Sequence, residues 1–129
     1  MGAQRFSEAI VLFSQILEQT PNDVYALVGR AVAFLESGMF KAAESDLSKA
    51  LQYDPENRDA LWRRAFIFSS QGRLDEAEID ARKAIEVAPS YGHSHFALAT
   101  VAFQRNKFAE AIASIDKAIQ LPPGGGQSS

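Results

Sequence analysis

The chain has 129 residues, of which 47% are hydrophobic and 22% are charged, a composition typical of a folded domain rather than a disordered one. Its net charge of −3 argues against the basic surface that nucleic acid requires, so we expect no nucleic acid partner. It contains no cysteine, which rules out disulfides, thiol nucleophiles and thiolate metal sites. Its apolar runs are far shorter than the roughly 18 residues of a membrane span, so we expect no membrane insertion and, by default, a cytoplasmic location.

The first predicted helix covers residues 5–19. Its apolar side chains recur at helical spacing and form a wide stripe, made up of Phe6, Ala9, Ile10, Phe13, Ile16 and Leu17. The segment Pro21-Asn22-Asp23 ends this helix and starts the next, because proline cannot continue a helix and Asn or Asp accepts hydrogen bonds from new amino-terminal amides. In the register of the later segments this helix is the second of a pair, so we expect the chain to start within a repeat.

Six more helices are predicted after this turn, arranged as three hairpins. They cover residues 23–37 and 40–53, then 58–71 and 74–87, and finally 92–105 and 108–121. Gly38 closes the first helix of the first hairpin, since glycine tolerates the left-handed conformation that ends many helices. Residues 124–129 lack periodicity and apolar content, which predicts a flexible tail.

Equivalent residues of successive hairpins are separated by one constant interval along the sequence. It separates Ala9, Ala43, Ala77 and Ala111, and also Pro21, Pro55, Pro89 and Pro123. The pattern resembles the tetratricopeptide repeat family, whose helix-turn-helix unit of about 34 residues has a large residue, a small residue, an aromatic residue, two alanines and a proline at fixed offsets. In this chain they are Leu27, Ala31, Phe34, Ala43, Ala50 and Pro55, and they recur as Leu61, Ala65, Phe68, Ala77, Ala84 and Pro89.

The resemblance implies an all-α solenoid in which seven antiparallel-paired helices wind into a right-handed superhelix. It assigns residues 1–123 to a tetratricopeptide repeat domain, with a half repeat over 5–23 and full repeats over 24–57, 58–91 and 92–123. The last repeat has His95 in place of the large apolar residue, Ala102 in place of the aromatic residue and Asn106 in place of the turn glycine. We therefore expect the last hairpin to be less regular.

Members of this family bind peptides or other proteins in a concave groove lined by the first helix of each pair. By register, the resemblance implies that the groove residues are Tyr25, Val28, Val32, Leu35, Asp59, Trp62, Arg63, Phe66, Ser70, His93, Phe96, Thr100 and Phe103. The alternative is that these side chains pack between neighbouring first helices as core. Because other residues already fill the inward face of helix 58–71, we interpret Trp62 and Phe66 as ligand contacts.

One subfamily of these domains holds the acidic carboxyl terminus of a heat-shock chaperone with a clamp of Lys, Asn and Arg. Arg63 matches a clamp arginine, whereas Gly29 and Asp59 stand where the clamp asparagine and a clamp lysine are expected. The co-chaperone-like clamp is therefore incomplete, and binding of a chaperone tail is not the favoured hypothesis.

Arginine and aspartate recur together in the first two full repeats. The interval from Arg30 to Asp46 is the same as the interval from Arg64 to Asp80. The equivalent positions of the last repeat hold Leu98 and Ser114, so arginine is present only where aspartate is present. This co-occurrence predicts an ion pair between the two helices of a hairpin, with a structural role.

The sequence carries no recognisable catalytic or metal-binding arrangement, so we predict a protein that is not an enzyme and needs no cofactor. His93 and His95 are two residues apart and therefore point in different directions around a helix, which argues against a zinc site. The leading hypothesis is an interaction module that binds a peptide or partner protein in its groove. Two alternatives stay open: an assembly element that forms homo-oligomers through its open ends, and a regulatory domain of a larger protein.

Overall fold

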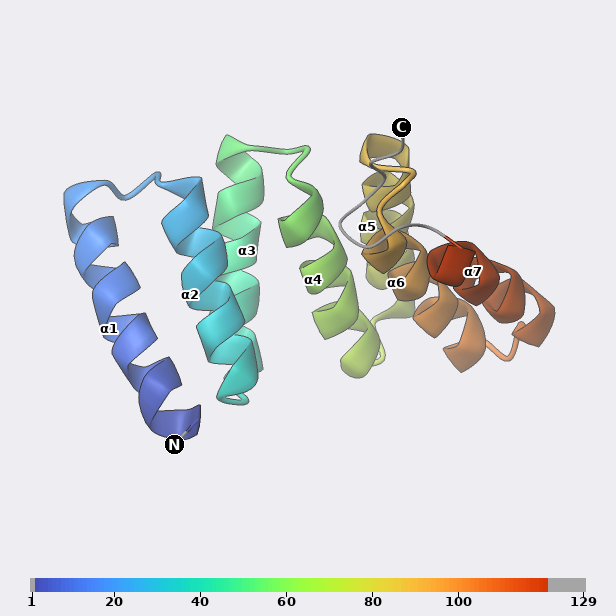
Figure 1. Ribbon diagram of the computed structural model, residues 1–129, viewed down its shortest axis with the longest axis horizontal. Coiled ribbons are helices and arrows are strands. Elements are labelled where there is room, and N and C mark those ends of the chain that lie inside the picture. The colour runs from blue at the N-terminus through green and yellow to red at the C-terminus, as the bar shows by residue number, and fades with distance from the viewer. Residues whose placement is uncertain (1, 121–129) are drawn as a thin grey trace. The chain divides into compact units, whose positions relative to one another are not determined.

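The computed structural model describes residues 2–120, with side chains described from residue 5 onward. This part of the chain contains seven helices and no strand. They are α1 (Gly2–Gln19), α2 (Val24–Glu36), α3 (Phe40–Tyr53), α4 (Arg58–Ser70), α5 (Leu74–Val87), α6 (Gly92–Gln104) and α7 (Phe108–Gln120) (Figure 1). The all-α prediction is confirmed, and the predicted tail over 124–129 lies outside the described residues.

The helix boundaries lie close to those that the sequence predicts, and α1 differs most because it begins at Gly2 rather than at residue 5. Local capping explains two of the other starts. The Asp23 side chain accepts a hydrogen bond of 3.0 Å from the Ala26 amide, and the Asn57 side chain accepts one of 2.9 Å from the Ala60 amide. Each bond satisfies an amide that has no partner inside its own helix.

Three tight turns join the helices within the hairpins. Gly38 and Gly72 adopt φ values of 78° and 77°, which a residue with a side chain rarely adopts. Asn106 holds the equivalent place in the last turn with a φ of 64°. Asparagine tolerates this left-handed conformation better than most residues do, so the substitution keeps the turn intact.

The chain divides into two compact units, residues 1–60 and residues 61–129, and the division falls within the first turn of α4. In the first unit α2 packs between α1 and α3, and successive helices run antiparallel (Figure 1). Its core is built from leucines and alanines: Leu17, Ala26, Leu27, Ala31, Ala33, Ala43, Leu47 and Ala50.

The second unit is built around small residues as well. Ala65, Ala81 and Ala97 form one buried cluster, which brings α4, α5 and α6 together. Phe68, Ala77 and Val101 form another, with Leu74 packed against it. Alanines at these contacts let the helix backbones approach closely, while the larger side chains fill the space between them.

Candidate functional site

The first helix of each hairpin leaves large apolar side chains exposed. Tyr25 on α2 is 81% exposed, Phe66 on α4 is 45% exposed, and Phe96 and Phe103 on α6 are 53% and 62% exposed. On α4, other residues than Phe66 are buried and form its core positions, namely Leu61, Ala65 and Phe68. The exposed aromatic residues are therefore not part of the buried core of these helices.

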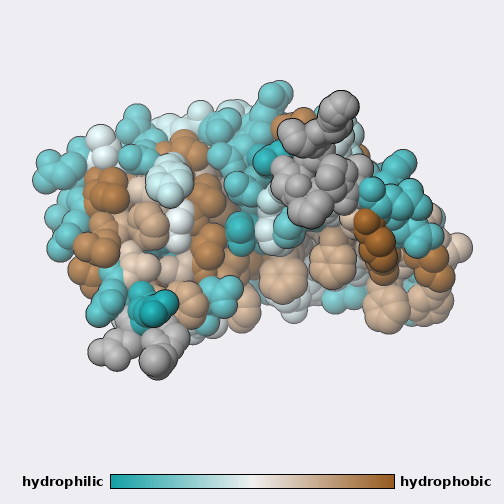
Figure 2. All heavy atoms as spheres, viewed as in Figure 1, coloured by the Kyte–Doolittle hydropathy of each residue, from teal (hydrophilic) through white to brown (hydrophobic). Residues whose placement is uncertain are grey.

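In the first unit, α1 and α2 border an open pocket of about 520 Å³. Its lining is almost wholly apolar: Phe6, Ala9, Phe13, Val24, Tyr25, Val28, Gly29, Val32 and Ala33, together with Asn57 and Asp59. Figure 2 shows the corresponding brown side chains gathered over α1 and α2. Four predicted groove residues line this pocket, namely Tyr25, Val28, Val32 and Asp59, whereas Leu35 is half-buried outside it.

Gly29 decides how closely α1 and α2 approach beside this pocket. A Cβ atom at this position would lie only 2.5 Å from Cζ of Phe13, well inside van der Waals contact. The missing side chain therefore makes room for the Phe13 ring against α2. An asparagine of the chaperone clamp at this position would displace that ring.

In the second unit, Trp62 lies at the centre of an aromatic cluster. Its ring centroid is 4.6 Å from that of His93, which in turn is 5.0 Å from that of Tyr91. The Arg63 guanidinium lies 4.6 Å from the Trp62 ring centroid, within the range of a cation–π contact. Trp62 Nε1 and Arg63 Nε are both buried and have no hydrogen-bond partner among the described residues.

Trp62 also packs against the buried alanine cluster of Ala65, Ala81 and Ala97, so it contributes to the core as well as to the surface. A contact of Trp62 with a ligand stays a prediction. Phe66 and Phe96 are clearer cases of exposed rings. The Phe103 ring contacts Phe108 edge-on, with centroids 5.4 Å apart.

The hydroxyl groups predicted to line the groove make local hydrogen bonds. Ser70 donates to the Ile67 carbonyl at 2.8 Å, and Thr100 donates to the Phe96 carbonyl at 3.1 Å. Both bonds satisfy the hydroxyl within its own helix. The apolar side chains therefore distinguish this surface more than its hydroxyl groups do.

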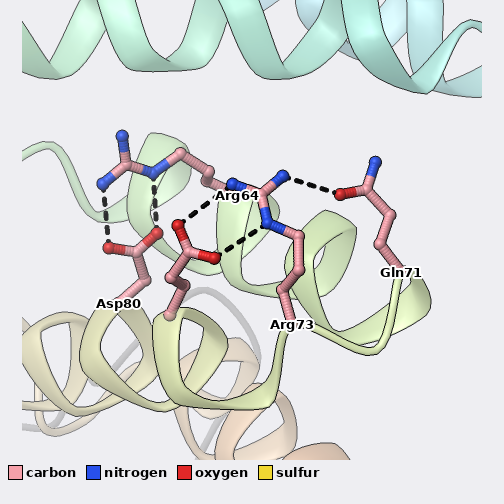
Figure 3. A network of polar contacts seen from close by, with 5 residues as sticks. Arg64, Gln71, Arg73 and Asp80 are labelled. Carbon is pink, nitrogen blue, oxygen red and sulfur yellow. Dashed lines mark hydrogen bonds and ion pairs between the residues drawn. The ribbon is translucent and has the colours of Figure 1, made fainter.

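Both arginine–aspartate pairs singled out in the sequence lie within hydrogen-bonding distance. Arg30 donates to Asp46 at 2.7 and 2.8 Å, and Arg64 donates to Asp80 at 2.7 and 2.9 Å (Figure 3). Both carboxylates are buried, and the bidentate geometry is the strongest that arginine forms with a carboxylate. The hydrogen bonds that Arg30 donates to the Asp46 carboxylate raise the pKa of Arg30 above its usual value, although partial burial acts to lower it.

Arg30 also connects three helices of the first unit. It lies on α2, donates to Asp46 on α3, and donates through a third nitrogen to Ser14 Oγ on α1 at 3.0 Å. All five of its N–H donors belong to one planar group, so these contacts fix the orientation of the side chain. The pair thus joins the two helices of its hairpin and connects them to α1.

The two histidines lie in different environments. His95 is buried, and its Nε2 lies 2.7 Å from the Pro89 carbonyl, to which it donates. His93 is exposed and stacks on Trp62. Among the described residues there is no group of three His, Asp or Glu side chains placed to hold a metal ion.

Two family models, both described as tetratricopeptide repeat, match this chain. One matches residues 34–79, and the other matches residues 1–47 and 71–126. The chain belongs to the tetratricopeptide repeat family. Repeats of this family generally serve as protein-interaction modules. No curated protein matches the chain.

Solved structures of tetratricopeptide repeat proteins have the same fold. A tetratricopeptide repeat protein from Parabacteroides merdae matches 90% of the chain over 45% of its own length, with a TM-score of 0.81 and 22% identity. MamA from Desulfovibrio magneticus RS-1 matches 92% of the chain over 67% of its own length, with a TM-score of 0.80 and 18% identity. MamA MSR-1 matches 90% of the chain over 67% of its own length, with a TM-score of 0.73 and 21% identity.

These likenesses concern the fold, and the chain spans about two thirds of the MamA proteins and less than half of the Parabacteroides protein. They confirm the predicted all-α solenoid of tetratricopeptide repeats. None of the helices within residues 2–120 combines the length and the apolar character needed to cross a bilayer.

Two groups of apolar side chains have surroundings that the sequence pattern does not reveal. Phe6, Ala9 and Phe13 belong to the apolar stripe of helix 5–19, and all three line the pocket of the first unit. Ile112 and Ile119 of α7 are exposed. The signal available in the sequence was the helical spacing of these side chains, which marks an apolar face but not what covers it.

Proposed function

We propose that this tetratricopeptide repeat chain is a scaffold whose first helices, α2 in the first unit and α4 and α6 in the second, bind peptides or segments of partner proteins on their exposed faces. The observation that carries the proposal is the exposure of Phe66, Phe96 and Phe103 on helices whose core positions are filled by other residues. Exposed aromatic rings of this kind bury a large area at a low entropic cost when a partner covers them.

The chemistry of the face supports recognition of an apolar segment. In the first unit the pocket offers Val28 and Val32 beside the phenol of Tyr25. In the second unit the Trp62 ring is flanked by His93 and by the positive charge of Arg63. Over the described residues these groups supply apolar area and a few directional polar contacts, which is the composition of a binding surface.

A displayed peptide library tests the proposal directly. Peptides selected on the unaltered chain are measured by calorimetry against a variant that carries Phe66→Glu, Phe96→Glu and Phe103→Glu. We expect the selected peptides to lose at least tenfold in affinity, because three charges replace apolar contact area. Circular dichroism confirms that the variant is folded.

The matched control carries the same substitution at exposed isoleucines of the second helices, namely Ile79→Glu, Ile112→Glu and Ile119→Glu. It introduces the same three charges in place of exposed apolar side chains and leaves the first helices intact. If the control loses binding and the phenylalanine variant keeps it, the exposed phenylalanines of α4 and α6 are not the binding surface, and the observation that carries the proposal fails.

A second function, self-assembly, is favoured by a separate observation. Val11 and Leu12 on α1, and Ile112 and Ile119 on α7, are exposed apolar side chains, and contiguous exposed apolar patches often mark protein–protein interfaces. Light scattering over a concentration series tests this function. Self-assembly predicts a larger particle that dissociates in Leu12→Glu, whereas a strict monomer at every concentration would rule it out.

A further inference from the structure

The pocket of the first unit occupies the place that a first helix holds in each later hairpin. Ala9 and Phe13 of α1 precede Ala43 and Leu47 of α3 by one full repeat. Ala43 and Leu47 are fully buried, and α2 packs against their helix. Ala9 and Phe13 instead line the open pocket. The uncovered face of α1 is therefore of the kind that a first helix covers in the same chain.

We propose that this pocket binds an amphipathic helix of a partner protein, which lies against α1 as α2 lies against α3. This inference rests on the proposed function, and it names the class of partner for the part of the binding surface that α2 forms. Helix-in-groove recognition uses apolar anchors spaced by three, four and seven residues. The later hairpins of the chain show which anchors this kind of face accepts.

The helices that cover equivalent faces share one spacing pattern. On α2 and α4 a buried leucine is followed four residues later by a buried alanine and seven residues later by a phenylalanine, as in Leu61, Ala65 and Phe68. The alanine lets the two helix backbones approach closely at the contact. The partner helix should therefore carry a large apolar residue, then a small residue at the fourth place and an aromatic residue at the seventh.

One position of the partner helix should differ from α2 and α4. Those helices carry Arg30 and Arg64, which pair with the buried Asp46 and Asp80. The residue of α1 one repeat before Asp46 is Leu12, which is 60% exposed. An arginine brought against Leu12 would lose hydration without gaining a carboxylate. The partner helix should therefore carry an apolar residue three places after its first anchor.

A second folded copy of this chain does not offer such a helix in its described residues. Its helices with the required spacing, α2 and α4, already bury their anchor residues Leu27 and Leu61 within their own hairpins. Its exposed helices, α1 and α7, are second helices of pairs and lack the pattern. The described residues of a second copy therefore do not supply the proposed helix.

The test is a nuclear magnetic resonance titration of the full chain labelled with ¹⁵N. The two probes are capped peptides of residues 58–70, one unaltered and one with Arg64→Leu. The reporter is the amide of Gly29, because this residue lines the pocket beside Phe13. The amides of Gly38 and Gly72 lie in turns and do not belong to the residues that line the pocket, so they serve as internal references.

We expect the Arg64→Leu peptide to shift the Gly29 amide at a concentration about fivefold or more lower than the unaltered peptide does, since an unpaired buried charge is costly. In a Leu12→Asp chain the preference should reverse, because an aspartate then faces the arginine as in the later hairpins. Leu12 is exposed, so this variant keeps its core. A third peptide, with Arg64→Leu and Ala65→Trp, should not bind, since it removes the small residue at the contact.

Three results would overturn the inference: no Gly29 shift with either peptide, a preference that Leu12→Asp leaves unchanged, or a Gly29 shift that follows protein concentration without peptide. The last result would place a second copy in the pocket. The peptide library described above separates this failure from that of the proposed function. If library peptides still bind through the exposed phenylalanines, the proposed function stands and only the helix inference falls.

Discussion

The hairpin of α4 and α5 and the hairpin of α6 and α7 share one repeat register but differ in how their helices are held. In the first, Arg64 and Asp80 form a buried bidentate ion pair, and α5 buries Ala77, Asp80, Ala81 and Ala84. In the second, the equivalent residues are Leu98 and Ser114, and α7 buries Ala111 alone among residues 108–120. The repeat pattern therefore specifies the helices, whereas the neighbours of each helix determine its burial.

The last hairpin also replaces an apolar contact by a polar one. His95 stands where the earlier repeats have Leu27 and Leu61, yet it is buried because its Nε2 donates to the Pro89 carbonyl. A buried imidazole is tolerated when its N–H is satisfied in this way. The irregularity predicted for this repeat thus appears in its polar contacts, while the turn at Asn106 keeps the geometry of the earlier glycine turns.

Asp80→Asn should produce the largest loss of stability. It removes the buried carboxylate charge that accepts two hydrogen bonds from the Arg64 guanidinium, which we expect to cost about 3 kcal/mol. Urea unfolding measures the change. The control is Asp75→Asn, since Asp75 also contacts an arginine at 2.7 Å but is almost fully exposed, and should change stability by less than about 1 kcal/mol. Equal midpoints for the two variants would mean that burial of the pair has no energetic role.

Ala77→Leu should come next, because Ala77 is fully buried against Phe68 and its cluster has no room for three more carbons. Overpacking of this kind costs about 1–3 kcal/mol. Thermal unfolding gives the change in midpoint. Ala113→Leu on the exposed side of α7 is the control and should be nearly neutral. A neutral Ala77→Leu would show that close helix contact is not needed in this hairpin.

Leu98→Arg combined with Ser114→Asp should transplant the ion pair into the last hairpin. The repeat register places these residues as Arg64 and Asp80 are placed, so the two changes should stabilise each other by about 1–2 kcal/mol relative to their separate effects. Urea unfolding of the parent, both single variants and the double variant completes the cycle. Strictly additive effects would show that the last hairpin differs in more than this pair.

Asn106→Ala should have the smallest effect. A φ of 64° costs an alanine about 1 kcal/mol, because its Cβ approaches the backbone in the left-handed conformation. Asn106→Gly should leave the unfolding midpoint unchanged or slightly raised, as the glycines of the earlier turns suggest. Identical midpoints for the alanine and glycine variants would mean that this turn relaxes to another conformation.

The periodic features of this protein could be predicted closely from the sequence. Helix boundaries followed from the apolar spacing, from Pro21 and from the turn glycines, because these signals act within a few residues along the chain. The co-occurrence of arginine and aspartate in two repeats was informative because two helices of a hairpin always face each other at the same register. Phe6 and Phe13 were harder to assign, since whether they form core or line a pocket depends on a helix beside them.

The sequence by itself determined the fold family, the helices of residues 2–120 and the residues that each hairpin presents, because so regular a repeat allows few other arrangements. Tertiary structure alone decided the pocket beside Gly29, the packing of Trp62 on the buried alanine cluster and the exposure of apolar side chains on α1 and α7. The reason is physical: local spacing fixes which face of a helix is apolar, whereas exposure is set by what packs on that face. In a repeat protein every helix carries a similar face, so the open ones become visible only when the helices are placed together.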